Sequence, residues 1–121
     1  MIQGLRTVSY PVPDLARGKE WYARVLAKEP YFDQPFYVGF EVGGFELGLI
    51  PDGEPGATGA TAYWGVADVF AAVRKLLEFG AVLRDDVMDV GEGIKVATVL
   101  DPFGNVFGVI ENPLFDRAAV R

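Results

Sequence analysis

Carboxylates are the main side chains of this chain that could perform acid–base chemistry, because its 121 residues include no histidine and no cysteine. Without histidine the chain can form neither a Ser-His-Asp triad nor the two-histidine facial triad that binds non-haem iron. Without cysteine it has no thiolate nucleophile, disulfide or zinc–thiolate site. General acid–base catalysis near neutral pH would therefore fall to a carboxyl, lysine or tyrosine whose pKa is shifted.

Glu41 and Glu46 are the candidate catalytic residues. They flank Gly43-Gly44, which is a two-residue turn signal for a β-hairpin. A turn at these glycines makes the two glutamates cross-strand neighbours, and two close carboxylates can separate their pKa values and yield a base near neutrality. The alternative is that both are solvated side chains near the tip of the hairpin.

The same hairpin predicts two different faces for residues 36–50. One face is apolar and would pack on a helix, with the pairs Val38 and Leu49, Phe40 and Leu47, and Val42 and Phe45. The other face is mixed and contains two glycines, which is typical of a surface over a cavity. Its members are Tyr37, Gly39, Glu41, Glu46, Gly48 and Ile50.

Residues 101–111, DPFGNVFGVIE, predict a turn followed by a buried strand. Pro102 fixes φ at the first turn position, and Gly104 and Asn105 tolerate left-handed conformations. Gly108 lies in the middle of the apolar strand and leaves space where a side chain would otherwise be.

The elements that position these residues follow one order in both halves of the chain. We expect a strand, a helix that begins after an aspartate cap, and three further strands in each half. The first half has a strand at 5–12, a helix at 15–28 after Asp14, an edge piece at 29–35 and the hairpin. The second half has a strand at 61–67, a helix at 69–79 after Asp68, a short strand from 81, an acidic loop with Asp85, Asp86, Asp89 and Glu92, and strands at 94–100 and 106–110.

This internal repeat predicts an α+β fold. Two βαβββ modules, about 3–51 and 60–113, would be joined by the Gly- and Pro-rich linker 51–60 into one domain, 1–121. We expect an eight-stranded, cup-shaped mixed sheet with the helices outside. The helices should bury the stripes Leu15, Tyr22, Val25 and Leu26, and Val69, Val73, Leu76 and Leu77, with Trp21 as further packing. The repeat makes Gly48 and Gly108 equivalent.

The overall composition excludes several classes of partner. A net charge of −6 argues against binding to nucleic acid or to an anionic membrane surface, because both require basic residues in excess. No apolar run approaches the roughly 20 residues of a membrane helix, and the N-terminus carries no signal-peptide pattern, so a cytoplasmic location is the default expectation.

Three segments in this order resemble the vicinal oxygen chelate superfamily, which includes glyoxalases, extradiol dioxygenases, fosfomycin resistance proteins and bleomycin-binding proteins. They are residues 12–15 (VPDL) before Trp21-Tyr22, residues 66–69 (VADV) before the second helix, and residues 101–105 (DPFGN). The resemblance spans residues 7–112. It implies the fold, and it implies pairing of two copies, so a homodimer is expected.

Enzymes of this superfamily usually hold a divalent metal, and the resemblance assigns its ligand positions to residues that cannot hold one. These positions fall on Thr7, Gly48, Ala62 and Gly108. Glu111 lies past the ligand position on the opposite strand face from Gly108, so its expected role is structural. Glu46 shares the face of Gly48, but one carboxylate is a poor metal site. We therefore expect no metal and no cofactor.

The first functional hypothesis is a metal-independent protein of the bleomycin-resistance type that binds a small planar or cationic molecule in the cup. Small residues at the former ligand positions would enlarge the pocket, and Trp64 could stack on a planar ligand. The alternative is that these residues only fill space between the sheets. The expected ligand contacts are Thr7, Ser9, Tyr37, Gly48, Ile50, Ala62, Trp64 and Gly108.

Three other functions stay open. A metal-free lyase or isomerase could use Glu41 or Glu46. A metal-dependent lyase or dioxygenase is disfavoured by the absence of histidine. A non-catalytic subunit could act through its sheet edges.

Overall fold

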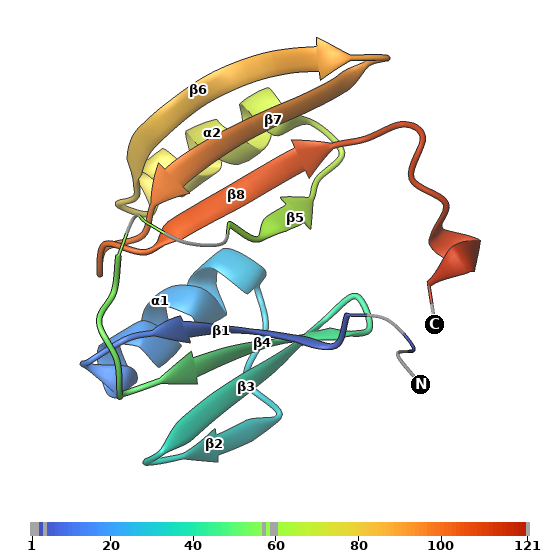
Figure 1. Cartoon of the computed structure of the whole chain (residues 1–121). Helices are drawn as coiled ribbons and strands as arrows, with labels where there is room; N and C mark the ends of the chain where they lie inside the picture. The colour runs from blue at the N-terminus through green and yellow to red at the C-terminus, as the bar shows by residue number, and fades with distance from the viewer. Residues whose placement is uncertain (1–2, 4, 57, 59–60, 121) are drawn as a thin grey trace. The chain divides into compact units, whose positions relative to one another are not determined.

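The computed structural model describes residues 3, 5–56, 58 and 61–120 (Figure 1). The chain divides into two compact units, Met1–Pro55 and Gly56–Arg121, so the boundary lies inside segment 51–60. Residues 57, 59 and 60 of that predicted linker lie outside the described residues. Both units have the order βαβββ, as the repeat predicted, and the eight strands of the described residues form two four-stranded mixed sheets.

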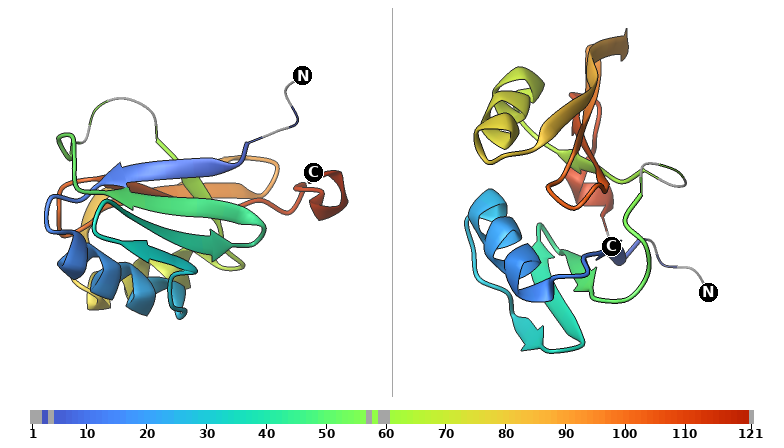
Figure 2. Two further views of the ribbon diagram at one scale, coloured as in Figure 1. Left: turned by 90° about the horizontal axis from the view of Figure 1, so that it is seen from below. Right: turned by 90° about the vertical axis from the view of Figure 1, so that its left-hand side faces the viewer.

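The first unit contains one helix and one sheet whose spatial order is β1-β4-β3-β2. Strand β1 runs parallel to β4, and the other neighbours are antiparallel. In both views of Figure 2 the helix lies along one face of this sheet. The elements are β1 (Thr7–Pro11), α1 (Leu15–Leu26), β2 (Phe32–Gln34), β3 (Tyr37–Val42) and β4 (Phe45–Ile50).

Helix α1 begins at the predicted cap and carries the core of the first unit. The Asp14 carboxylate accepts a hydrogen bond from the Arg17 N–H at 3.1 Å. The helix ends at Leu26, two residues short of our expectation, because Ala27 adopts a left-handed conformation with φ of 55°. Trp21 and Tyr22 are both buried, and the Tyr22 ring packs against Tyr10 and Trp21, which confirms their predicted role in packing.

The hairpin of β3 and β4 has the predicted turn and register. Gly43 and Gly44 both have positive φ, which only glycine adopts readily. The predicted pairs Val38 with Leu49, Phe40 with Leu47, and Val42 with Phe45 are confirmed. Both β3 and β4 contact α1, so the opposite face, which includes Glu46 and Gly48, points away from the helix.

The second unit repeats this arrangement with sheet order β5-β8-β7-β6 and helix α2 against one face (Figure 1). Ser9 of β1 pairs with Gly48, and Tyr63 of β5 pairs with Gly108. Ser9 precedes the helix cap Asp14 by the same spacing as Tyr63 precedes the helix cap Asp68, so the two glycines occupy equivalent positions. The elements are β5 (Tyr63–Gly65), α2 (Val69–Glu78), β6 (Val82–Gly91), β7 (Ile94–Leu100), β8 (Val106–Glu111) and the short 3₁₀ helix η1 (Arg117–Ala119).

Helix α2 buries a narrower stripe than we predicted. Val69, Val73 and Leu76 are buried, but Leu77 is 41% exposed. The first three residues lie within about 60° of one another around the helix, whereas Leu77 lies further round at the border of the stripe. The prediction for Leu77 is therefore wrong. Neither α2 nor any other helix in the described part of the chain is long and apolar enough to cross a membrane.

The predicted acidic loop is also wrong, because most of it belongs to β6. This strand runs without a break from Val82 to Gly91 and pairs with β7, with shifts in register near Asp85, Met88 and Asp89. An edge strand tolerates aspartates because their side chains face solvent. The turn lies later, at Gly91-Glu92-Gly93, where all three residues have positive φ.

The turn at 101–105 is stabilised by the buried carboxylate of Asp101. It accepts hydrogen bonds from the Phe103 N–H at 2.9 Å, from the Asn105 N–H at 2.8 Å and from the Asn105 side-chain amide at 3.1 Å. The Asp101 N–H in turn donates to the Asn105 carbonyl at 2.8 Å. This turn connects β7 to β8 and so positions Gly108.

Candidate functional site

Glu46 is the centre of a polar cluster on the face of the first sheet that points away from α1. The Tyr31 hydroxyl donates a hydrogen bond to its Oε1. The Tyr37 hydroxyl donates to Oε2 at 2.5 Å, and the Thr7 hydroxyl donates to the same oxygen at 3.4 Å. Three hydroxyl groups from β1, β3 and the segment before β2 thus converge on one half-buried carboxylate.

Two glycines make room for this cluster. A Cβ atom at Gly39 would lie 3.0 Å from Glu46 Oε1, 3.2 Å from the Tyr37 ring and 3.4 Å from the Tyr31 ring. A Cβ atom at Gly48 would lie 2.6 Å from Tyr37 Cζ. The absence of side chains at Gly39 and Gly48 therefore lets both tyrosines approach the sheet and reach Glu46.

Glu41 is the cross-strand neighbour of Glu46, as predicted, but it has different partners. The Lys28 ammonium forms an ion pair with Glu41 at 2.7 Å, and the Gly44 N–H donates to its carboxylate at 2.6 Å. The hydrogen bond from Lys28, followed by that from Gly44 and the positive charge of Lys28, lowers the pKa of Glu41. A base near neutrality needs a raised pKa, so these contacts disfavour Glu41 as a general base.

An open hollow of ≈ 580 Å³ adjoins Glu46 on the surface of the first unit. Thr7 and four other predicted ligand contacts belong to the first sheet. Ser9 of β1 and Gly48 of β4 are neighbours, Tyr37 covers Gly48, and Ile50 is the last residue of β4. The hollow is lined by Arg6, Thr7, Tyr31, Glu41, Gly44, Phe45 and Glu46.

The remaining predicted contacts belong to the second unit, where Tyr63 covers Gly108. A Cβ atom at Gly108 would lie 2.6 Å from the Ala62 carbonyl oxygen and 2.7 Å from Tyr63 Cδ1. Trp64 pairs with Val109 and stacks on the buried ring of Phe107, with ring centroids 6.3 Å apart, so its side chain lies on the opposite face from Gly108.

Sequence reasoning missed Tyr31 and Tyr63. Tyr63 could have been found from the repeat, since it precedes Asp68 by the same spacing as Ser9 precedes Asp14. Tyr31 precedes the regular part of β2, so no alternation pattern predicted the direction of its side chain.

The four positions that the resemblance assigns to metal ligands do not fit a metal ion. The Tyr37 phenol fills the space at Gly48, and the Ala62 carbonyl and the Tyr63 ring fill the space at Gly108. The Thr7 hydroxyl donates its hydrogen bond to Glu46. Within residues 3, 5–56, 58 and 61–120, no group of three or more acidic, histidine or cysteine side chains could hold a metal ion.

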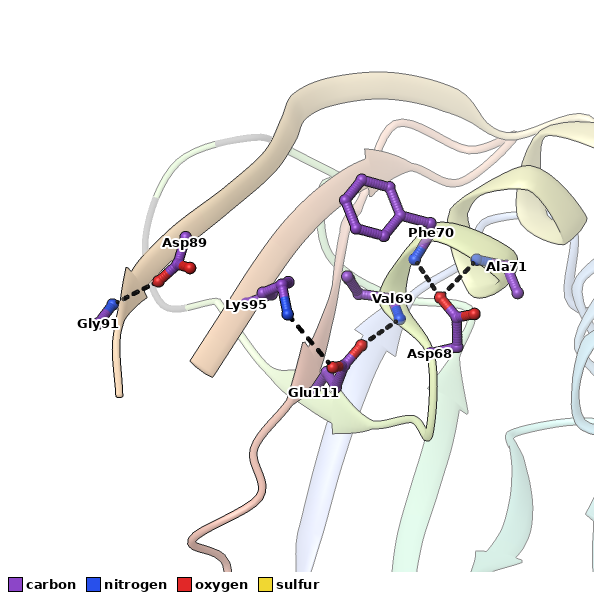
Figure 3. A network of polar contacts seen from close by, with 8 residues as sticks. All are labelled: Asp68, Val69, Phe70, Ala71, Asp89, Gly91, Lys95 and Glu111. Carbon is purple, nitrogen blue, oxygen red and sulfur yellow. Dashed lines mark hydrogen bonds and ion pairs between the residues drawn. The ribbon is translucent and has the colours of Figure 1, made fainter. Parts of the chain in front are cut away.

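Glu111 has the structural role that its spacing predicted. Figure 3 shows its carboxylate between the start of α2 and β7. Oε1 accepts a hydrogen bond from the Val69 N–H at 3.0 Å, and Oε2 forms an ion pair with Lys95 at 3.6 Å. At the same helix end, Asp68 accepts hydrogen bonds from Phe70 and Ala71 (Figure 3). The two carboxylates together satisfy three N–H groups of the first turn.

Comparison with known proteins agrees with this fold. The model of the Glyoxalase/Bleomycin resistance protein/Dioxygenase superfamily matches residues 4–109. A glyoxalase-related enzyme from Fulvimarina pelagi is similar with a TM-score of 0.76 and 16% identity, over 95% of this chain and 92% of that one. A lactoylglutathione lyase from Agrobacterium tumefaciens gives 0.74 and 19%, over 94% and 97%.

A superfamily member from Sphaerobacter thermophilus has a TM-score of 0.73 and 21% identity, over 93% of this chain and 99% of that one. At these identities the likeness to solved structures concerns the fold alone. No curated protein matches the chain.

Proposed function

This chain belongs to the Glyoxalase/Bleomycin resistance protein/Dioxygenase superfamily, and we propose that it is a metal-independent member that binds a small organic molecule, cationic or planar. The observation that carries the proposal is the Glu46 carboxylate, which three hydroxyl groups hold on the face of the first sheet beside an open hollow. A site with a few placed polar groups on a rigid sheet is typical of small-molecule recognition.

Metal independence is supported by the residues at the ligand positions. The chain contains no histidine or cysteine, and the spaces at Gly48 and Gly108 are filled by neighbouring atoms of the same chain. A divalent ion needs several protein ligands, which these positions do not supply.

A cationic ligand is better supported than a purely planar one. Glu46 presents a fixed negative charge, and the net charge of −6 attracts cations to the protein. The sequence predicts that a planar ligand stacks on Trp64. The Trp64 ring instead stacks on Phe107, on the face of the second sheet that is opposite to Gly108. The exposed ring of Tyr31 lies near Glu46 instead, since its hydroxyl donates a hydrogen bond to that carboxylate.

A screen of ligand-dependent thermal stability tests the proposal, with aromatic amines and ammonium ions and their neutral planar analogues as probes. We expect cations to raise Tm, since a ligand at 100 times its Kd stabilises by about 2.7 kcal/mol. Glu46→Gln should remove the effect of the cations. Glu54→Gln, which makes the same charge change at an exposed residue of segment 51–60, should retain it.

Two results would contradict the proposal. The binding function is wrong if no probe, cationic or planar, stabilises the wild-type protein. Metal independence is wrong if the purified protein contains stoichiometric Fe, Mn, Ni or Zn by elemental analysis.

A second candidate function is a metal-free lyase or isomerase that uses the same carboxylate. The hydrogen bonds from two phenols to Glu46 favour it, because such groups can hold and transfer protons. The measurement is exchange of solvent deuterium into a bound ligand in D₂O. Exchange that Glu46→Gln abolishes would support an enzyme, and a ligand that binds without exchange would leave binding as the function.

A further inference from the structure

We propose that the face around Glu46 selects quaternary and tertiary ammonium ions over primary ammonium and guanidinium ions. This inference rests on the proposed function, in which a small molecule binds beside Glu46. It adds the chemical class of that molecule, and it follows from two properties of the face: a wall of aromatic rings, and a carboxylate whose acceptor positions are mostly occupied.

The aromatic wall lies on β2 and at the ends of β2 and β3. Tyr31 and Phe36 are 66% and 65% exposed, so both rings are accessible to a ligand. Phe32 packs edge-on against Phe36, with centroids 6.1 Å apart, and against Tyr37, with centroids 5.9 Å apart. Aromatic ring faces attract cations, and aromatic cages are a common way to bind quaternary ammonium groups.

The wall and the carboxylate share one face of the sheet. Phe32 pairs with Gly39 across β2 and β3, and the position of a Gly39 Cβ would be 3.0 Å from Glu46 Oε1. Tyr31 and Tyr37 connect the two features directly, because each presents its ring to Gly39 and its hydroxyl to Glu46. A cation on these rings would therefore lie close to the negative charge.

The hydrogen bonds that Glu46 already accepts determine which cations fit. A carboxylate offers about four acceptor positions. Tyr31 takes one on Oε1, and Tyr37 and Thr7 take two on Oε2, so about one remains. A guanidinium ion needs a free position on each oxygen for bidentate binding.

Primary ammonium ions face the same shortage of acceptors. A primary ammonium has three N–H donors, and most of these would lose water without gaining a partner at Glu46. A quaternary ammonium ion has no N–H group and a tertiary one has a single N–H, so neither incurs this loss. Both keep the attraction of their charge to Glu46 and to the rings.

Neighbouring charges do not alter this preference for quaternary and tertiary ammonium ions. Glu41 is engaged by Lys28 in an ion pair of 2.7 Å, so the two charges largely offset each other. The Arg6 guanidinium at the rim of the hollow donates to the Leu5 carbonyl at 3.3 Å and to the Gln3 side chain at 3.1 Å. Its positive charge would weaken the binding of all monovalent cations to a similar extent.

A matched series of probes tests the selectivity by calorimetric titration of the full chain. The series is benzyltrimethylammonium, benzylammonium and benzamidinium, with neopentylbenzene as the neutral isostere. We expect benzyltrimethylammonium to bind with a Kd about tenfold below those of the other two cations. Equal or tighter binding of benzylammonium or benzamidinium would overturn the selectivity but leave a cation-binding function standing, whereas binding of no cation overturns the selectivity altogether.

The Tyr31→Phe variant tests the cause of the selectivity, because it keeps the ring but frees an acceptor position on Oε1. Benzylammonium should gain affinity for this variant relative to benzyltrimethylammonium. Tyr63→Phe is the matched control in the second unit, where the same change should leave the ratio of the two Kd values unaltered. An unaltered ratio in Tyr31→Phe, with the fold checked by circular dichroism, would show that acceptor occupancy is not the cause.

Discussion

Gly48 and Gly108 occupy equivalent positions in the two sheets, and a tyrosine covers each of them. At Gly48 the nearest atoms belong to the side chain of Tyr37, whereas at Gly108 they include the backbone carbonyl of Ala62 as well as the ring of Tyr63. A side chain can rotate away from a new methyl group more easily than a strand backbone can move. The two positions should therefore differ in how they tolerate a larger residue.

Alanine at either glycine should destabilise the protein through overpacking, by about 1–3 kcal/mol. We expect Gly108→Ala to cost more than Gly48→Ala, as measured by urea denaturation. Tyr37→Leu should relieve the cost of Gly48→Ala, whereas Tyr63→Leu should leave most of the cost of Gly108→Ala, because the Ala62 carbonyl remains.

The matched control is Gly65→Ala on β5, where a Cβ atom would meet nothing within 4 Å. Its stability should stay within about 0.5 kcal/mol of wild type. Equal costs at all three glycines would contradict the assignment of Tyr37 and Tyr63 as fillers of these spaces.

At the scale of elements, the turn between β7 and β8 is built around one buried carboxylate. Asp101 satisfies two backbone N–H groups and the Asn105 amide, in a turn where Gly104 has φ of 95°. Because β8 pairs with both β5 and β7, its start at Val106 sets the register of the second sheet. The DPFGN segment is thus explained by hydrogen bonding and backbone conformation.

Asp101→Ala should destabilise the protein by about 2–4 kcal/mol, since it leaves buried N–H groups without an acceptor. Asp101→Asn should cost less, because its amide oxygen can still accept from the Phe103 and Asn105 N–H groups. Urea denaturation followed by tryptophan fluorescence measures both. Asp52→Ala, at an exposed aspartate, serves as the control, and a comparable loss there would show that the effect is one of net charge rather than of the turn.

At the scale of the whole molecule, the charge of −6 acts on ligands as well as on solubility. Acidic residues in excess raise the local concentration of small cations around the protein, and salt screens this attraction. The contribution of the overall charge can therefore be separated from that of the local contacts by its dependence on ionic strength.

The affinity for benzyltrimethylammonium should fall as ionic strength rises from about 10 mM to about 1 M, over which the Debye length shrinks from about 30 Å to about 3 Å. Calorimetric titration at several salt concentrations measures the change. Neopentylbenzene, which carries no charge, should show no such loss. A cation affinity that is independent of salt would indicate that the rings alone hold the ligand.

Much of the fold could be predicted because its signals are local. Asp14 and Asp68 begin the helices, and Gly43-Gly44 sets the hairpin, since each acts through nearby backbone groups. The errors arose where position in the sheet outweighs local pattern. The run of aspartates in β6 resembles a loop, yet it forms a strand at the edge of the sheet, where charged side chains are tolerated.

The candidate site could be predicted only in part. The register of the hairpin placed Glu46, Gly48 and Tyr37 on one face, because alternation within a strand follows directly from the sequence. The partners of Glu46 could not be predicted in the same way, since Thr7 and Tyr31 come from other segments of the chain. The stacking of Trp64 on Phe107 could not be predicted either, because the two residues are distant in sequence. Without that partner in view, the sequence predicts a ligand contact for Trp64.

The sequence by itself therefore determined the two βαβββ modules, their capped helices, the DPFGN turn and the absence of metal-binding side chains at the expected positions. Only the tertiary structure decided what fills those positions, with Tyr37 over Gly48 and Tyr63 over Gly108. It also brought three hydroxyl groups to Glu46. The physical reason is that caps and turns depend on neighbouring residues, whereas contacts across a sheet depend on strand pairing between distant segments.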